Sequence, residues 1–135
     1  MIAICDTGPL FAAADGDDAQ HSASLRVLRD GALQLVIPAL VVAELTYFIA
    51  SRLGAAAEAR FLAALGAMEV EPPFGSDWAR MAELVQQYAD LRLGGTDASI
   101  VALAERLNVT TIVTLDRRHF AAVRPLHAET FTLLP

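Results

Sequence analysis

The chain has 135 residues, of which 55% are hydrophobic, and it carries sixteen acidic residues, ten arginines and no lysine, for a net charge of −6. This size and composition suit one compact domain over residues 1–135, and the net charge argues against a protein that coats nucleic acid nonspecifically. The missing lysine excludes phosphate-loop nucleotide hydrolases and Schiff-base enzymes, because arginine cannot replace their ammonium group.

Strands and helices are expected to alternate through the first half of the chain. Residues 1–5 are wholly apolar, which is typical of a strand covered on both faces in a parallel sheet. The segment Asp6–Pro9 then turns into a short helix that reaches Ala14. After a polar break, the pattern predicts a helix over 19–29, a strand over 33–37, a helix over 38–53 and, past Gly54, a helix over 55–65.

The second half continues in the same way. Residues 68–71 predict a short strand that is less buried than the others, because two prolines follow it. Ser76 or Asp77 can cap a helix to about residue 91, with an apolar stripe that includes Trp78, and Thr96 can cap a helix to Leu107. Residues 110–115 predict a buried strand and 129–134 an edge strand. The alternation implies a three-layer α/β/α sandwich around a mostly parallel sheet.

The expected location is the cytoplasm. No apolar stretch approaches the roughly 20 residues of a membrane span, and the N-terminus lacks the basic flank and cleavage signal of a secretory peptide. The only cysteine, Cys5, lies in an expected strand, which predicts a buried thiol in a reducing compartment.

Four carboxylates are placed where this fold would gather them. Asp6 and Asp116 each follow a strand, at the carboxyl edge of the sheet where such folds bind ligands. Glu44 and Asp97 stand on helices whose neighbouring positions on the same face are apolar, and neither helix supplies a basic partner at the matching spacing. Because buried like charges stay ionised together only around a cation, the set predicts a metal site.

Each acid also has a structural explanation. Asp6 and Asp116 could cap the short helices that follow them, and Asp97 lies in a first helical turn, where the macrodipole favours a negative charge. Glu44 is harder to explain in this way, because the rest of its face is expected to be core, formed by Ile37, Leu40, Val41, Tyr47 and Phe48.

Basic residues recur beside the acids and are candidates for phosphate contacts, weighed against an ordinary solvated role. Arg117 and Arg118 follow Asp116 directly, Arg124 is nearby, and Arg92 shortly precedes Asp97. The histidines have no metal-ligand spacing, so a surface or structural role is expected for His21, His119 and His127.

Taken together, these segments resemble a PIN domain. The resemblance rests on four stretches, which are Asp6-Thr7-Gly8-Pro9-Leu10, Pro38 through Glu44-Leu45, Thr96-Asp97-Ala98, and Thr114-Leu115-Asp116 with Phe120 behind it. It extends from residue 1 to about residue 120, and within the family the size and order are similar to VapC-type toxins of bacterial toxin–antitoxin pairs.

The resemblance implies an endoribonuclease that uses magnesium or manganese. Asp6, Glu44, Asp97 and Asp116 match the acidic quartet of the family, and Thr7 and Thr114 match its hydroxyl positions beside the metal. The family also implies a homodimer and a small antitoxin of the VapB type that blocks the cleft.

Metal-assisted phosphodiester hydrolysis suits this inventory, because one or two hard cations can activate water and neutralise the charge on the reacting oxygens. We expect Asp6 and Asp97 as direct ligands, while Glu44 and Asp116 could bind a second ion, bind through water or position the attacking water. Thr114 is expected to fix a carboxylate or a metal-bound water. Substrate contacts are expected from Thr7, Arg92, Arg117 and Arg118.

Three other functions agree with parts of this sequence. A phosphohydrolase with Asp6 as nucleophile would want a second acid where Gly8 stands and a lysine later in the chain. A noncatalytic RNA- or protein-binding module would not need all four acids. A protein that acts only by docking through the apolar helices 40–53 and 55–65 is not exclusive of catalysis.

Overall fold

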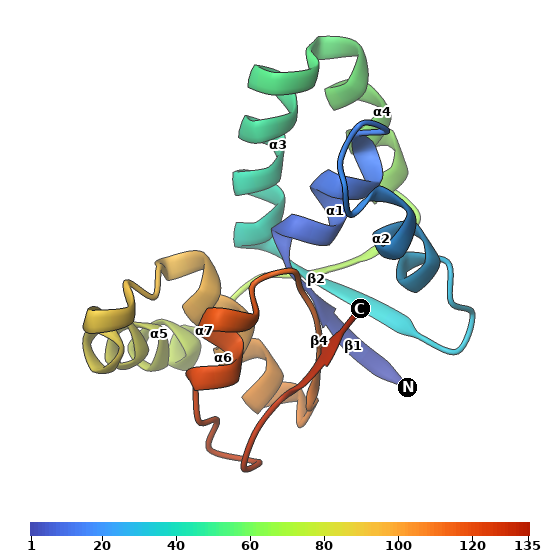
Figure 1. The fold of residues 1–135 in the computed structure, drawn as a ribbon. Helices are drawn as coiled ribbons and strands as arrows, with labels where there is room; N and C mark the ends of the chain where they lie inside the picture. The colour runs from blue at the N-terminus through green and yellow to red at the C-terminus, as the bar shows by residue number, and fades with distance from the viewer.

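A five-stranded parallel sheet forms the centre of the computed structural model, which describes residues 1–135 (Figure 1). The strands are β1 (Ile2–Cys5), β2 (Gln34–Pro38), β3 (Glu69–Glu71), β4 (Thr111–Val113) and β5 (Thr132–Leu134). Their spatial order is β3-β2-β1-β4-β5, and every neighbouring pair is parallel. The expected α/β fold with a mostly parallel sheet is confirmed.

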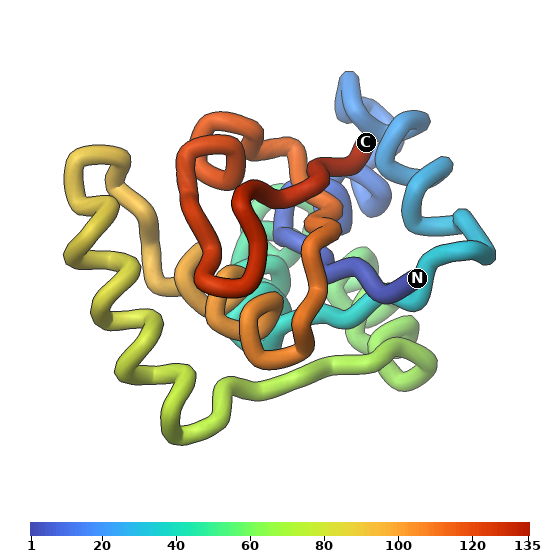
Figure 2. Tube along the Cα trace, turned by 90° about the horizontal axis from the view of Figure 1, so that it is seen from below, coloured from blue at the N-terminus to red at the C-terminus, as the bar shows by residue number.

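Helices connect the strands and cover the sheet in two groups. They are α1 (Thr7–Ala14), α2 (His21–Leu28), α3 (Ala39–Leu53), α4 (Ala55–Leu65), α5 (Gly75–Gln87), the 3-10 helix η1 (Ala89–Leu91), α6 (Gly95–Leu107) and α7 (Arg117–Ala122). In Figure 1, α1 to α4 gather at the upper right and α5 to α7 at the lower left, and Figure 2 also separates the two groups. The result is the three-layer α/β/α arrangement.

The core lies between β1, β4 and α6. Residues Ala3–Cys5 of β1 and Ile112–Val113 of β4 are completely buried. Helix α6 buries seven consecutive residues, Ala98–Ala104, as expected of a helix covered on all sides. The free thiol of Cys5 is buried as predicted, and burial raises its pKa. Strand β3 is the less buried edge strand, as expected, with Val70 37% exposed.

Helix α3 is less buried than its sequence suggested. Its core-facing residues are Val41, Leu45 and Ile49, four residues apart along one face. Tyr47 is 71% exposed, so the expectation that the whole face around Glu44 is core was wrong. Glu44 instead lies at the border of the buried stripe and reaches a pocket, described below.

Helices α5 and α6 begin earlier than predicted. The N-caps are Phe74 and Gly94, rather than Ser76, Asp77 or Thr96. In each case an aspartate in the first turn reaches back to the cap residue: Asp77 Oδ2 accepts from Phe74 N at 2.9 Å, and Asp97 Oδ2 accepts from Gly94 N at 3.1 Å. This backward bond satisfies an N–H group that would otherwise lack a partner.

The predicted apolar stripe of α5 is only partly buried. Met81 and Leu84 enter the core, whereas Trp78 is 52% exposed and Val85 is 38% exposed. The α-helix also ends at Gln87, and the tighter η1 carries the chain onward. None of the helices has both the length and the hydropathy that crossing a membrane requires.

Candidate active site

Two neighbouring strands deliver two of the acids to the same edge of the sheet. Cys5 of β1 pairs with Val113 of β4, and the next residue, Asp6, donates its backbone N–H to the Val113 carbonyl at 2.9 Å. Beyond β4, the Thr114 hydroxyl donates to Asp6 Oδ2 at 2.7 Å and accepts from the N–H of Asp116 at 2.9 Å. One buried hydroxyl therefore fixes the relative positions of two carboxylates that lie far apart in the sequence.

The helix-capping roles that the sequence allows for Asp6 and Asp116 are also present. Asp6 Oδ1 accepts from the N–H of Thr7 at 2.7 Å, and Asp116 Oδ1 accepts from the N–H of His119 at 3.0 Å, so each acid caps the helix after it. Each cap engages Oδ1, and the Oδ2 atoms bond to Thr114 and His119 respectively. Capping and membership of a site are thus compatible for both residues.

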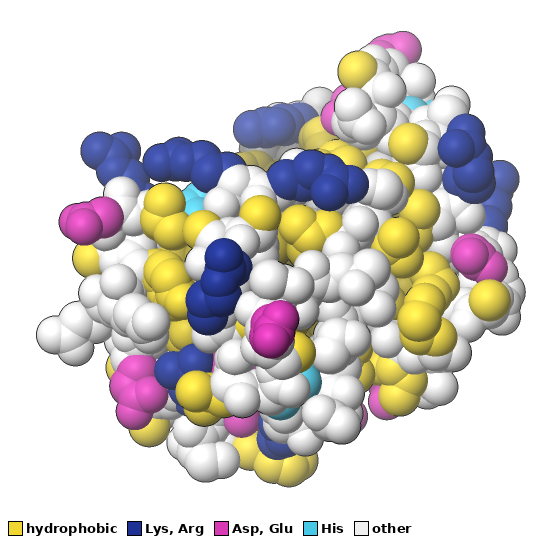
Figure 3. All heavy atoms as spheres, turned by 60° about the horizontal axis from the view of Figure 1, so that its bottom comes forward, with side chains coloured by type: hydrophobic (Ala, Val, Ile, Leu, Met, Phe, Trp, Pro, Cys, Tyr) yellow, Lys and Arg dark blue, Asp and Glu magenta, His cyan; other side chains and the backbone are white.

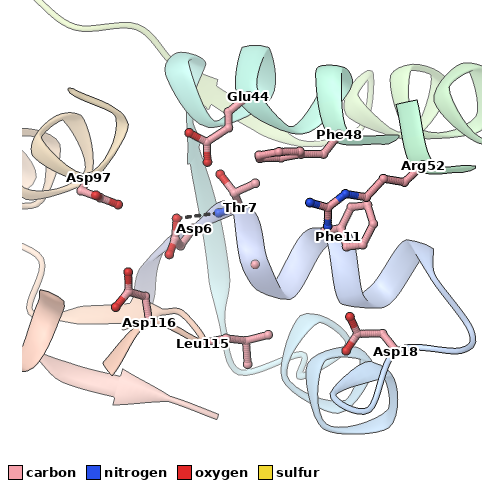
Figure 4. A pocket seen from close by; sticks show the side chains of 11 residues that line it. Asp6, Thr7, Phe11, Asp18, Glu44, Phe48, Arg52, Asp97, Leu115 and Asp116 are labelled. Carbon is pink, nitrogen blue, oxygen red and sulfur yellow. Dashed lines mark hydrogen bonds between the residues drawn. The ribbon is translucent and has the colours of Figure 1, made fainter. Parts of the chain in front are cut away.

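All four candidate acids line one pocket of about 520 Å³. Asp6 and Asp116 come from the sheet edge, Asp97 from the first turn of α6, and Glu44 from the middle of α3. Figure 4 shows the four carboxylates directed into a common space. The complete lining is Asp6, Thr7, Gly8, Phe11, Asp18, Glu44, Phe48, Arg52, Asp97, Leu115 and Asp116.

The acids in this pocket influence one another's pKa values. Burial raises the pKa of Asp6 to about 6, against the opposing effect of the Thr114 and Thr7 hydrogen bonds, and the charges of Asp97 and Asp116 raise it further. Burial likewise raises the pKa of Asp97, with added contributions from Asp116 and Glu44. A crowded group of carboxylates that disfavours its own ionisation is the setting in which a cation binds.

His119 supports the site, although no pattern in the sequence singled it out. Its Nδ1 lies 2.5 Å from Asp116 Oδ2, and its Nε2 lies 2.6 Å from the carbonyl oxygen of Leu91. Since both ring nitrogens face acceptors, the doubly protonated ring fits best. The hydrogen bond to Asp116 raises the pKa of His119, and the histidine charge in turn partly offsets the rise in the pKa of Asp97.

The donor set suits a hard, hydrated cation. No three His, Cys, Asp or Glu side chains converge closely enough to enclose an ion by themselves. The pocket instead offers four separate carboxylates and the buried Thr7 hydroxyl, whose oxygen has no hydrogen-bond partner within the protein. Magnesium prefers oxygen ligands and keeps several of its waters, and these side chains can accept hydrogen bonds from such waters.

The arginines proposed for substrate contact lie outside this pocket. Arg92 and Arg118 are exposed, and Arg117 donates to the carbonyl of Pro135, so their contact with substrate remains a prediction. Positive charge is nevertheless grouped, since several arginine side chains gather along one edge of the face in Figure 3. The basic residue that does line the pocket is Arg52, which the sequence did not single out.

Comparison with known proteins gives consistent matches over nearly the whole chain. A family model described as the PIN domain matches residues 3–125. The chain is 40% identical over 134 residues to Ribonuclease VapC26 of Mycobacterium tuberculosis, covering 98% of this chain and 99% of that protein.

Solved structures share the fold at lower sequence identity. The Sarcin-Ricin loop cleaving toxin VapC20 of M. tuberculosis superposes with a TM-score of 0.83 at 18% identity, covering 96% of this chain and 99% of that one. VapBC2 from Rickettsia felis, bound to a DNA fragment from its promoter, gives 0.72 at 19% identity over 100% of both chains. A toxin–antitoxin complex from Klebsiella pneumoniae gives 0.71 at 21% identity, covering 90% and 92%.

Proposed function

We propose that this chain is a metal-dependent endoribonuclease, because it belongs to the PIN-domain family and is similar over its length to a VapC ribonuclease. As a single PIN-like domain over residues 1–135, it would hydrolyse RNA phosphodiester bonds and act as the toxin of a type II toxin–antitoxin pair. The observation that carries the proposal is the meeting of four carboxylates in one pocket at the carboxyl edge of a parallel sheet.

Magnesium or manganese, when bound, would supply an activated water and neutralise charge on the scissile phosphate. Asp6 and Asp97 would hold the ion, and Glu44 and Asp116 would hold it through water or orient the attacking water. Thr114 keeps Asp6 and Asp116 in register through its two hydrogen bonds. His119 orients Asp116, and the buried Thr7 hydroxyl, which has no hydrogen-bond partner in the protein, would bond a water or a phosphate oxygen.

Cleavage of total RNA by the purified protein tests this proposal. With magnesium or manganese we expect discrete fragments, which disappear with a chelator and with Asp6→Asn. Asp17→Asn is the matched control, because Asp17 is exposed and outside the pocket. Cleavage that survives Asp6→Asn would point to another site or a contaminating nuclease. No cleavage under any metal would favour a noncatalytic binding module.

We also propose a VapB-type antitoxin as partner. Helices α1, α2 and α4 enclose a second pocket of about 530 Å³, whose lining is mostly apolar and includes Leu10, Leu25, Leu28, Phe61 and Met68. Arg29 and Arg60 supply its positive charge, so the groove fits an apolar helix that carries acidic side chains. A small protein should copurify with the wild type and Asp6→Asn from native cells and be lost with Arg60→Glu. Equal recovery with Arg60→Glu would contradict this placement.

The proposed location is the cytoplasm, where the RNA substrate and the antitoxin would both be present. The proposed oligomeric state is a homodimer. Exposed apolar side chains on and before α5, namely Phe74, Trp78 and Val85, offer a surface for self-association. Light scattering should give twice the monomer mass for the wild type and the monomer mass for Trp78→Glu. A monomeric wild type would rule the dimer out.

A further inference from the structure

The pocket that holds the acids has a second, chemically different end. Glu44, Phe48 and Arg52 are spaced four residues apart on α3, so they form one line along the helix, and all three line the pocket. The line is roughly 12 Å long at the rise of an α-helix. In Figure 4, Glu44 lies among the acids while Phe48 and Arg52 lie at the opposite end, beside Phe11 of α1.

Arg52 and two aromatic rings are organised at that end. The guanidinium carbon of Arg52 lies 5.0 Å from the centroid of the Phe48 ring and 5.5 Å from that of Phe11. Arg52 takes part in none of the ion pairs of the protein. It is also the one basic residue among the eleven that line the pocket.

The two aromatic residues differ in what they do for the fold. Phe11 packs against the hydrophobic core, whereas Phe48 does not belong to the core cluster or to the residues packed on it. Phe48 is half-buried and meets the exposed Tyr47 edge-on, with 5.8 Å between ring centroids. A large aromatic side chain that stays out of the core and borders a polar pocket is available to a ligand.

The chemistry of this end suits a nucleobase. Unpaired bases stack on aromatic rings and on the plane of an arginine, and they do so without base pairing. A phosphate alone would find one cation but also the carboxylate of Asp18, which lies at the same end of the pocket (Figure 4). A carboxylate repels phosphate, whereas it can accept hydrogen bonds from the amino groups of a base.

We propose that Phe48, Arg52 and Phe11 form a stacking subsite for an unpaired nucleobase of the RNA, next to the nucleotide whose phosphate occupies the acidic end. The proposal rests on the proposed ribonuclease function, because it assumes that RNA crosses the pocket. It makes Phe48 and Arg52 substrate-positioning residues and predicts a single-stranded substrate.

Binding of labelled RNA separates this subsite from the chemistry. Fluorescence anisotropy would compare a random-sequence RNA pool of about 12 nucleotides, long enough to cross the pocket, with an abasic strand of the same length and sugar–phosphate backbone. An Asp97→Asn background would prevent the proposed cleavage. In that background, Phe48→Ala should weaken binding of the RNA pool about 5- to 150-fold, the range expected for the loss of one stacked base. Binding of the abasic strand should not change.

Matched variants test each part of the subsite. Phe48→Leu keeps an apolar side chain without a ring and should weaken binding of the RNA pool nearly as much as Phe48→Ala does. Arg52→Lys keeps the charge without the guanidinium plane, so it should weaken binding of the RNA pool but not of the abasic strand. Arg26 is an exposed arginine on α2 that does not line the pocket, so Arg26→Ala should match the parent. Unchanged thermal unfolding would show that each variant is folded.

The outcomes also keep the two proposals apart. If Phe48→Leu and Arg52→Lys bind the RNA pool as the parent does, the subsite does not hold a base and the inference is wrong, even if the wild type cleaves RNA. The same holds if these variants weaken the RNA pool and the abasic strand equally, or if the parent binds neither. If Phe48→Leu selectively weakens the RNA pool while the wild type shows no metal-dependent cleavage, the subsite stands and the ribonuclease proposal fails.

Discussion

Replacing Asp6 by asparagine should stabilise the metal-free protein at neutral pH. Asp6 is 7% exposed, and its pKa of about 6 in the folded protein compares with an ordinary value of 3.8. At about 1.36 kcal/mol per pKa unit, ionised Asp6 therefore costs the fold about 3 kcal/mol. Asparagine removes that charge at nearly the same volume.

Part of this gain is offset by a poorer hydrogen bond. The amide oxygen of the introduced asparagine can still accept from Thr7, but the Thr114 hydroxyl now faces an N–H group and loses its acceptor. Such a loss costs about 1 to 2 kcal/mol. The net expectation is a variant more stable by about 1 kcal/mol at pH 7, or on the order of 4 °C in Tm for a chain of this size.

The effect of Asp6→Asn on stability should depend on pH in a defined direction. A carboxyl whose pKa is raised by folding contributes stability below 3.8, and this contribution is lost as the pH rises through about 6. The advantage of Asp6→Asn should therefore be full above about pH 7 and should become a disadvantage at about pH 4, where little remains except the lost hydrogen bond. Magnesium should reverse the order, because it stabilises only a protein that binds it, by about 2.7 kcal/mol at roughly one hundred times the Kd.

The assay is thermal or urea unfolding across pH, with chelator and with magnesium, for wild type, Asp6→Asn and the exposed control Asp17→Asn. An Asp6→Asn protein that is less stable than wild type without metal at neutral pH, with no dependence on pH, would refute the reasoning. Asp6 would then be a helix cap whose charge the fold tolerates.

Three further changes test other parts of the site and its support. Thr114→Val removes the hydroxyl that bonds Asp6 and Asp116, so it should lower stability by about 1 to 3 kcal/mol and reduce cleavage, while Thr114→Ser should restore both; normal cleavage by the valine variant would contradict this role. His119→Ala should reduce metal-activated cleavage about 10- to 100-fold, because His119 orients the carboxylate of Asp116. If the dependence of cleavage on magnesium concentration is unchanged, His119 does not have this role. Arg80→Ala breaks a two-point contact with Glu105, at 2.8 and 2.9 Å, that joins α5 to α6; urea unfolding should show a loss of about 2 kcal/mol, and magnesium affinity of the folded protein should not change.

The strands and helices could be predicted because apolar runs and the glycine and proline residues that end them are local features of the sequence. The run before Asp6 and the run before Asp116 each identified a strand, and a parallel sheet brings their carboxyl ends together whatever the loops do. The N-caps of α5 and α6 were misplaced by two or three residues, because an aspartate in the first turn can cap backward as well as serve as the cap itself.

His119 and Arg52 could not be predicted in the same way. The contact of His119 with Leu91 joins segments that are distant in the sequence, and the contact of Arg52 with Phe11 depends on how α3 crosses α1. The spacing of Glu44, Phe48 and Arg52 was visible, but a helix face with apolar residues is more often core than pocket. Only the fold shows that the buried stripe of α3 passes through Val41, Leu45 and Ile49 instead.

Anomalous diffraction from crystals soaked in manganese tests the central claim most directly. The account predicts a peak in the pocket between Asp6, Glu44, Asp97 and Asp116, absent from crystals of Asp6→Asn grown and soaked in the same way. A manganese peak elsewhere on the molecule, with none in this pocket, would contradict it.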